Sequence, residues 1–456
     1  MDSDDKIRLW DFQNSAVRAV WDAYRRGLTR VLLVSPGGSG KTVMLGAVAR
    51  KAINEGRRVL VFAHRRELVF QAVEHFGRMG VTEHRIGVLL PGLREEPDRP
   101  LQVGSVQTLY ARLDTLPPAD FVIVDEAHHA AADSYRAVAA RYPKARWLGL
   151  TGTPFRLDGQ GLKSVFDEMV VAAKSSELIA TKRIALPRIF AAPEDALPNL
   201  QQLRRVAGDY ALGPLSERMN RSTLVGGLVH NYRRHADGET ALVFAVSVAH
   251  SERIVRGFER AGIVAAHLDG TTSTRDREQI LADFGSGKIK VLSNCMLLSE
   301  GYDLPRCGAV LLARPTLSLA LYLQQVARAL RWYHGKRPVV LDHARNVRRF
   351  GLPHSDREFS LDDGVAHGAA ASLVRECKSC GAFVSIGCRV CPECGTEFRE
   401  EPSIPTVKPM TLVEITKKQQ EELAVRLRAH LRQRGETDEA WVERVVAAWT
   451  ATNAPV

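Results

Sequence analysis

Short hydrophobic runs alternate with segments of helical periodicity from about residue 10 to about residue 345. The runs are rich in Val, Leu and Ile, and a stretch with weak periodicity separates the first four from the last four. Parallel strands flanked by helices give this alternation. The pattern therefore predicts an α/β protein with two tandem parallel-sheet domains. The runs are residues 31–34, 59–62, 121–124 and 147–150, then 241–244, 290–292, 309–312 and 339–341.

The same pattern sets the expected domain boundaries. The first sheet domain spans residues 1–165 and the second spans 226–350, and the weakly periodic, Pro-containing segment 166–225 is expected to connect them. A cluster of cysteines follows and indicates a small module over residues 373–400. Leucines at four-residue spacing predict a helical tail over residues 408–452.

The composition is that of an ordinary globular protein, since 45% of the 456 residues are hydrophobic and 25% are charged. That balance excludes a disordered chain and a small disulfide scaffold. No run approaches the roughly 18 consecutive apolar residues of a membrane-spanning helix. The acidic start of the chain also differs from a signal peptide, so we expect a cytoplasmic protein with no membrane partner.

Basic residues outnumber acidic ones unevenly along the chain. It has 63 Lys and Arg against 52 Asp and Glu, a formal charge of +11. Residues 311–350 hold eight of the basic residues and a single acid, Asp342. Such a basic stretch predicts a polyanionic partner, although a solvated helix face explains Arg345, Arg348 and Arg349 equally well.

A phosphate-binding loop directly follows the first apolar run. Residues 35–42 read Ser-Pro-Gly-Gly-Ser-Gly-Lys-Thr and lead into a helical segment. Small residues let backbone N–H groups surround phosphates, the lysine reaches the β and γ phosphates, and the threonine hydroxyl binds Mg²⁺. A glycine turn between strand and helix is the simpler alternative. The candidate residues are Gly37, Gly38, Ser39, Gly40, Lys41 and Thr42.

Two adjacent carboxylates, Asp125 and Glu126, end the third apolar run, 84 residues after Lys41. In parallel sheets, the carboxyl ends of strands lie at one edge, beside such a loop. Asp125 is therefore expected to hold Mg²⁺, and Glu126 to accept a proton from the water that attacks the γ-phosphate. A solvated strand end is the alternative if this acidic pair is taken alone.

Seven further elements occur in the chain. Together with these two motifs, they resemble in identity and order the motifs of superfamily 2 helicases and translocases of the DEAD/DEAH-like class, over about residues 9–345. They are Phe12-Gln13, which is similar to the adenine-reading glutamine, 62–68 (motif Ia), 104–108 (motif Ib), Thr151-Gly152-Thr153-Pro154 (motif III), 243–247 (motif IV), Ser293-Asn294 with Glu300-Gly301-Tyr302-Asp303 (motif V) and 324–331 (motif VI).

The resemblance implies two RecA-like domains that hydrolyse one ATP between them and a nucleic-acid groove faced by motifs Ia, Ib, IV and V. It assigns the second domain's part of the nucleotide site to Gly301, Asp303 and Gln324, with Arg328 and Arg331 as arginine fingers. It also makes His128, Thr151, Thr153 and Gln324 couplers between that site and the groove. Ala327 departs from the pattern, because motif VI has glycine before its first arginine.

Five of the seven cysteines fall between residues 377 and 394. Two Cys-x-x-Cys-Gly knuckles, at Cys377 and Cys380 and at Cys391 and Cys394, have the spacing of a closed tetrahedral Zn²⁺ site. We interpret them as the ligands of a structural zinc ribbon and Cys388 as a spare. The ribbon or the helical tail is a candidate contact for a protein partner.

A helicase core followed by such a module resembles most closely the RadD-like and phage-encoded DEAD/DEAH ATPases of DNA repair or recombination. That likeness favours DNA over RNA as the track. Three alternatives remain open: an RNA-remodelling ATPase, an ATP-gated clamp that binds nucleic acid without unwinding it, and the motor subunit of a restriction system.

Overall fold

The computed structural model describes residues 8–63, 66–156, 161–193, 198–200, 202–206, 208–220, 222–298, 304, 306–333, 335–362 and 374–398, with isolated positions 424, 425, 428, 439, 442 and 443. The described residues up to 398 form one compact unit, and the isolated positions after 398 do not belong to it. The tail predicted over 408–452 lies outside the described residues apart from the isolated positions. Among the residues described, no helix is both long enough and apolar enough to cross a membrane.

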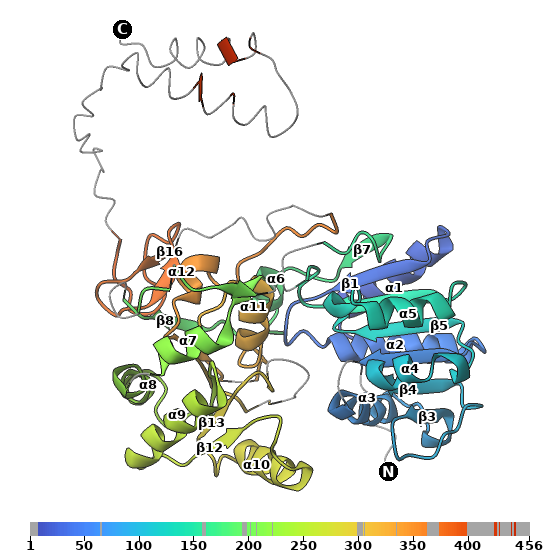
Figure 1. The fold of residues 1–456 in the computed structure, drawn as a ribbon, viewed down its shortest axis with the longest axis horizontal. Coiled ribbons are helices and arrows are strands. Elements are labelled where there is room, and N and C mark those ends of the chain that lie inside the picture. The colour runs from blue at the N-terminus through green and yellow to red at the C-terminus, as the bar shows by residue number, and fades with distance from the viewer. Residues whose placement is uncertain are drawn as a thin grey trace. The chain divides into compact units, whose positions relative to one another are not determined.

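The first domain is a seven-stranded parallel sheet in the order β3-β4-β2-β5-β6-β1-β7 (Figure 1). Alternate residues of its strands enter two cores: Val31 and Leu33 pack under α1, α2 and α3, whereas Leu32 and Val34 pack under α4 and α5. The elements are β1 (Arg30–Val34), β2 (Val59–Ala63), β3 (Ile86–Leu89), β4 (Leu101–Ser105), β5 (Phe121–Asp125), β6 (Arg146–Thr151) and β7 (Glu168–Val171), with α1 (Asp11–Arg25), α2 (Lys41–Asn54), α3 (Arg66–Arg78), α4 (Val106–Ala111), α5 (Asp133–Arg141) and the short helices η1 (Glu83–Arg85), η2 (Leu113–Thr115) and η3 (Ala127–His129).

The second domain is a six-stranded parallel sheet in the order β12-β13-β11-β14-β15-β8. Helices α8 and α9 cover one face, and α10, α11 and α12 cover the other. The elements are β8 (Arg188–Ala191), β11 (Ala241–Phe244), β12 (Ala265–Leu268), β13 (Val291–Asn294), β14 (Ala309–Leu312) and β15 (Val339–Asp342), with α6 (Ser175–Ala180), α7 (Leu212–Met219), α8 (Ser222–His235), α9 (Val248–Arg260), α10 (Thr274–Ser286), α11 (Leu319–Ala327) and α12 (Asn346–Phe350).

Two parallel sheets with helices on both faces confirm the predicted fold class of tandem RecA-like α/β domains. Both sheets also draw a strand from the segment expected to connect them, since β7 joins the first sheet and β8 the second. A short antiparallel pair, β9 (Arg205–Val206) and β10 (Asp209–Tyr210), lies in the same segment. An antiparallel hairpin, β16 (Val374–Glu376) and β17 (Phe383–Ser385), begins the cysteine module.

After α12 the chain returns to the first domain. The carbonyl of Leu361 accepts a hydrogen bond from the N–H of Leu162 at 2.9 Å. The ring of Phe359 lies 6.1 Å from the ring of Phe155. Residues 351–362 therefore form a strap that runs from the second domain onto the first, a contact that no sequence pattern predicts.

Candidate functional site

The phosphate loop turns from β1 into α2 and holds its own shape. Gly38 and Gly40 have φ values of 82° and 80°, in the left-handed region that glycine enters without strain. The hydroxyl oxygens of Ser35 and Ser39 are 2.6 Å apart, and the Ser39 hydroxyl donates to the carbonyl of Pro36 at 2.6 Å. Internal hydrogen bonds thus fix the loop before any ligand binds.

The amino terminus of α2 is open to an anion. Its N-cap residue, Gly40, offers no side-chain acceptor to the N–H groups of the first turn. These N–H groups and the positive end of the helix dipole favour a phosphate there. The Nζ of Lys41 lies 3.5 Å from the carbonyl of Ser35, and a side chain at Gly152 would come within 3.3 Å of this Nζ. Gly152 therefore leaves room for the lysine.

Gln13 lies against the phosphate loop and is 2% exposed. Its Nε2 donates to the carbonyl of Ser39 at 2.9 Å, and its Oε1 accepts from the backbone N–H of Trp10 at 2.9 Å. The amide thus bridges the start of α1 and the loop. Reading of adenine by Gln13 stays a prediction.

Two carboxylates stand at the end of β5. One oxygen of Asp125 accepts a hydrogen bond from the backbone N–H of Glu126 at 3.0 Å. Glu126 has a φ of 51°, which residues other than glycine rarely adopt, so the turn is strained at the residue expected to act as base. Burial, and after it the Glu126 carboxylate, raise the pKa of Asp125 to about 6 against the opposing effect of Lys41.

These groups fit ATP together with Mg²⁺. The loop N–H groups and Lys41 have the chemistry to bind phosphate oxygens, and Asp125 with the Thr42 hydroxyl offers the oxygen ligands that Mg²⁺ prefers. The pKa of Asp125 is raised first by burial and second by the neighbouring Glu126 carboxylate, and a divalent cation beside both carboxylates would oppose these two effects. A Mg²⁺ ion held by these residues would supply positive charge against the phosphates.

His128 links the two carboxylates to the second domain. Its Nδ1 lies 3.5 Å from Oε2 of Glu126 and 3.3 Å from the hydroxyl of Thr151, and its Nε2 lies 3.2 Å from Nε2 of Gln324 on α11. The Thr151 hydroxyl donates in turn to the carbonyl of Thr153 at 3.0 Å. The four expected coupling residues therefore form one chain of contacts that starts at Glu126.

The end of α11 packs on the phosphate loop. A Cβ added to Gly37 would overlap the Cβ of Ala327, although it would lie 3.4 Å from the Cα of that residue. A Cβ added to Gly38 would lie 3.5 Å from the backbone nitrogen of Arg331. The loop thus meets the segment that carries both expected arginine fingers, of which Arg328 is half-buried and Arg331 exposed. The two predicted site residues of motif V, Gly301 and Asp303, lie outside the described residues.

We expect Gly37→Ala to slow ATP hydrolysis by about 5- to 100-fold, because overpacking costs about 1–3 kcal/mol and here opposes contact between the loop and α11. The double variant Gly37→Ala/Ala327→Gly should recover most of the rate, since 3.4 Å to the remaining Cα is ordinary contact. Steady-state ATPase of the two single variants and the double variant measures this. Equal rates for Gly37→Ala and the double variant would show that the two residues do not meet during turnover.

Two known families match the two domains of this chain. Residues 6–156 match the family described as type III restriction enzyme, res subunit, and residues 223–333 match the helicase conserved C-terminal domain. The chain is 31% identical over 398 residues to a 51.5 kDa protein of a Lactococcus phage. The match covers 86% of this chain and 84% of the phage protein. The chain belongs to the superfamily 2 helicases. It is therefore an ATP-hydrolysing enzyme.

Other relatives of this helicase are more distant. IRC3 of Saccharomyces cerevisiae, whose name describes an ATP-dependent helicase, is 28% identical over 347 residues, and the match covers 72% of this chain and half of IRC3. DNA 3'-5' translocase XPB2 of Sulfurisphaera tokodaii is 24% identical over 366 residues, covering 72% of this chain and 79% of that protein. A fragment of an HsdR subunit of a type I restriction enzyme from Vibrio vulnificus shares the fold, with a TM-score of 0.59, 20% identity, and coverage of 75% of this chain and 65% of that chain.

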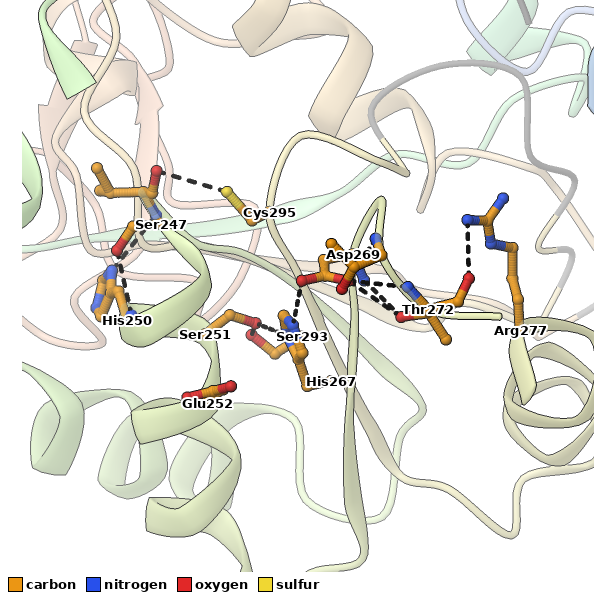
Figure 2. A network of polar contacts seen from close by, with 12 residues as sticks. Ser247, His250, Ser251, Glu252, His267, Asp269, Thr272, Arg277, Ser293 and Cys295 are labelled. Carbon is orange, nitrogen blue, oxygen red and sulfur yellow. Dashed lines mark hydrogen bonds and ion pairs between the residues drawn. The ribbon is translucent and has the colours of Figure 1, made fainter. Parts of the chain in front are cut away.

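A buried polar network joins the carboxyl ends of β12 and β13 in the second domain of the helicase (Figure 2). The hydroxyl of Ser251 lies 2.7 Å from both Nδ1 of His267 and the hydroxyl of Ser293. Nε2 of His267 lies 3.3 Å from Asp269. Burial opposes ionisation of Asp269, but hydrogen bonds from the backbone and hydroxyl of Thr271 hold its pKa at about 2.

This network ties the end of β13, from which motif V emerges, to α9, the helix that follows motif IV. Ser251 lies one turn into α9, whose N-cap Ser247 accepts a hydrogen bond from the N–H of His250 at 3.2 Å. Sequence reasoning missed His267 and Asp269, because neither belongs to the quoted motifs. The Asp-Gly-Thr-Thr stretch at 269–272 carries a turn signal, but the two serine partners come from distant segments.

The cysteine module brings its four predicted ligands together. The Sγ atoms of Cys377, Cys380, Cys391 and Cys394 all lie within 4.8 Å of one another, with separations of 3.6 Å for the first and last and 3.8 Å for the middle two. A tetrahedral Zn²⁺ at Zn–S distances of about 2.3 Å requires separations of about 3.8 Å. The cluster therefore fits Zn²⁺, and Cys388 lies outside it.

The module is docked on the second domain of the helicase. Glu393, inside the second knuckle, lies 2.9 Å from Nε of Arg188 on β8 and 3.1 Å from Arg337. Phe383 of β17 packs into the core beneath α11 and α12, and Arg348 lies 4.7 Å above its ring. The cysteine module therefore completes a wall of the second domain.

We expect Cys391→Ser to lose the bound zinc, since three thiolates leave the tetrahedral site incomplete and zinc binding, worth about 10–16 kcal/mol in such modules, is what folds them. Zinc content per chain, measured by elemental analysis after desalting, should fall from about one to near zero. Cys388→Ser is the matched control and should keep its zinc. Equal zinc content in both variants would contradict the assigned ligand set.

Proposed function

We propose that this helicase is a DNA helicase or translocase that couples ATP hydrolysis to movement along or remodelling of DNA. The contact chain from Glu126 through His128 to Gln324 carries the proposal, because it gives the ATP site a direct path into the second domain. A change at the γ-phosphate can then shift α11 and the strand ends beside it.

In this proposal each domain supplies part of the hydrolysis site. Lys41 and the loop N–H groups bind the phosphates, and Asp125 with Thr42 holds Mg²⁺. Glu126 accepts a proton from the attacking water, whose oxygen bonds to the γ-phosphorus as the bond to ADP breaks. Arg328 and Arg331 stabilise the charge that develops on the transferred group.

DNA is the favoured track for two reasons. The name of the XPB2 relative describes a DNA translocase, and the family model over the first domain is that of a restriction enzyme subunit. A role in repair or recombination is the one that the RadD-like resemblance implies.

The test is steady-state ATPase without nucleic acid, then with single-stranded DNA, duplex DNA, forked DNA or RNA, with Glu126→Gln as the blank. We expect DNA to stimulate turnover at least about tenfold and more than RNA does. Stimulation by RNA alone would replace DNA by RNA as the track. Rates indifferent to all four polymers, with ATP-dependent binding intact, would favour the ATP-gated clamp.

A further inference from the structure

A cavity of about 530 Å³ lies between the second sheet and the first zinc knuckle. Its volume falls within the range of about 300–1,000 Å³ that is usual for ligand pockets. Three parts of the chain form its walls: the ends of β8 and β15, the exposed turns of α8, and residues 376–381 of the cysteine module. In Figure 1, β8, α12 and β16 lie together at this side of the second domain.

The cavity opens at the carboxyl edge of the sheet. Ala192 and Pro193 follow β8, and His343 follows β15, which pairs with β8 in parallel. Motifs IV and V leave β11 and β13 at this same edge, where open α/β sheets bind their ligands. The cavity therefore continues the edge that the proposed function assigns to nucleic acid.

The charges around the cavity favour an anion. Arg234 on α8 and Lys378 in the knuckle are exposed, and neither forms an ion pair with any residue that the structure describes. The two acids of the wall are already engaged. Glu376 pairs with Arg348 at 3.1 Å, and Asp342 is buried and accepts backbone N–H groups of residues 344 and 347 at 3.1 and 2.6 Å. The two cations are thus left to face an incoming group.

One wall of the cavity is aromatic. The His235 ring stacks on Phe190 at 4.0 Å between centroids, with 24° between the planes. Burial, followed by the neighbouring Arg234 and Arg188, lowers the pKa of His235, which favours the neutral ring. Neutral aromatic surfaces beside cations are the combination that binds single-stranded nucleic acids. Asn231 adds an amide to the same wall.

We propose that this cavity binds one nucleotide of the single strand held by the helicase, with its phosphate against Arg234 and Lys378 and its base toward the Phe190–His235 wall. The inference rests on the proposed nucleic-acid function. It gives the zinc module a direct role, because the module supplies one of the two phosphate-binding cations. The strand contact therefore extends past the sheet edge to the metal-folded wall.

The test compares the full zinc-loaded chain with Arg234→Ala/Lys378→Ala in binding to oligo(dT) ladders at several salt concentrations. Arg233→Ala/Arg389→Ala is the matched control: it removes the same charge from the same two elements, but neither residue lines the cavity, and Arg233 instead donates to the carbonyl of residue 261. ATPase without DNA should be equal in all three proteins, because none of these residues belongs to the ATP site.

We expect the cavity variant to bind long oligo(dT) about tenfold or more weakly than the control. Its affinity should stop rising at a shorter oligonucleotide length than that of the control. The negative slope of log affinity against log salt should become shallower by about 1.4, which corresponds to two lost single-strand phosphate contacts. Affinity, length dependence and slope equal to the control would overturn the proposal. Absence of DNA binding by the unmodified protein would instead overturn the proposed function, so the two failures are distinguishable.

Discussion

The Glu126→Gln variant is expected to bind ATP with nearly unchanged affinity and to hydrolyse it about 10²- to 10⁴-fold more slowly, the range for loss of a positioned general base. Glutamine keeps the size of the side chain but cannot accept the proton of the attacking water. It also removes the charge that faces His128 at 3.5 Å, so the contact with α11 should weaken. Single-turnover hydrolysis measures the chemical step, and a fluorescent ATP analogue measures binding.

Glu252→Gln serves as the control for this variant, because Glu252 is an exposed carboxylate on α9 (Figure 2). It should hydrolyse ATP at the unmodified rate. A Glu126→Gln rate within threefold of the control would show that Glu126 is not the general base. The strained backbone of Glu126 would then have no catalytic explanation.

Arg331→Ala is expected to lower kcat by about 10³-fold or more, because arginine fingers contribute about 10³ to 10⁵ in phosphoryl transfer. Its backbone lies against the phosphate loop at Gly38, which places this residue beside the loop expected to bind the phosphates. Arg328→Ala should have an effect of the same order. Rates at saturating ATP separate this loss from weaker binding.

Arg331→Lys sharpens the result, since lysine keeps the charge but loses the planar fork that binds two phosphate oxygens at once. It should remain at least about tenfold slower than the unmodified protein. Arg253→Ala, at an exposed position on α9, controls for loss of charge. Full activity of both Arg331 variants would show that the first domain hydrolyses ATP without this finger.

Much of the fold was predictable because its central strands are continuous apolar runs buried on both faces, such as residues 121–124 and 241–244. The edge strands were not. β7 reads Glu-Met-Val-Val and β8 reads Arg-Ile-Phe-Ala, and each is four residues long within a Pro-containing segment. Short strands of mixed polarity carry too little periodicity to be separated from a connector.

The candidate site divides in the same way. Lys41, Asp125 and Glu126 were predictable because each stands at a fixed offset from an apolar run. The contact between Gly37 and Ala327 was not, because it depends on how the phosphate loop of the first domain and α11 of the second approach each other. Nor was the Glu393 pairing with Arg188, since a charged residue inside a zinc knuckle gives no sign of its partner.

The strap formed by residues 351–362 has a mechanical consequence for the two domains. A pair of bodies joined by one connector can turn about any axis through that point, whereas a second attachment removes most of these freedoms. Here the chain passes between the domains before β8 and again at the strap, where the N–H of Leu162 donates a hydrogen bond to the carbonyl of Leu361. The strap therefore limits how far the two domains can separate, so we expect their relative motion to be smaller than a single connector would allow.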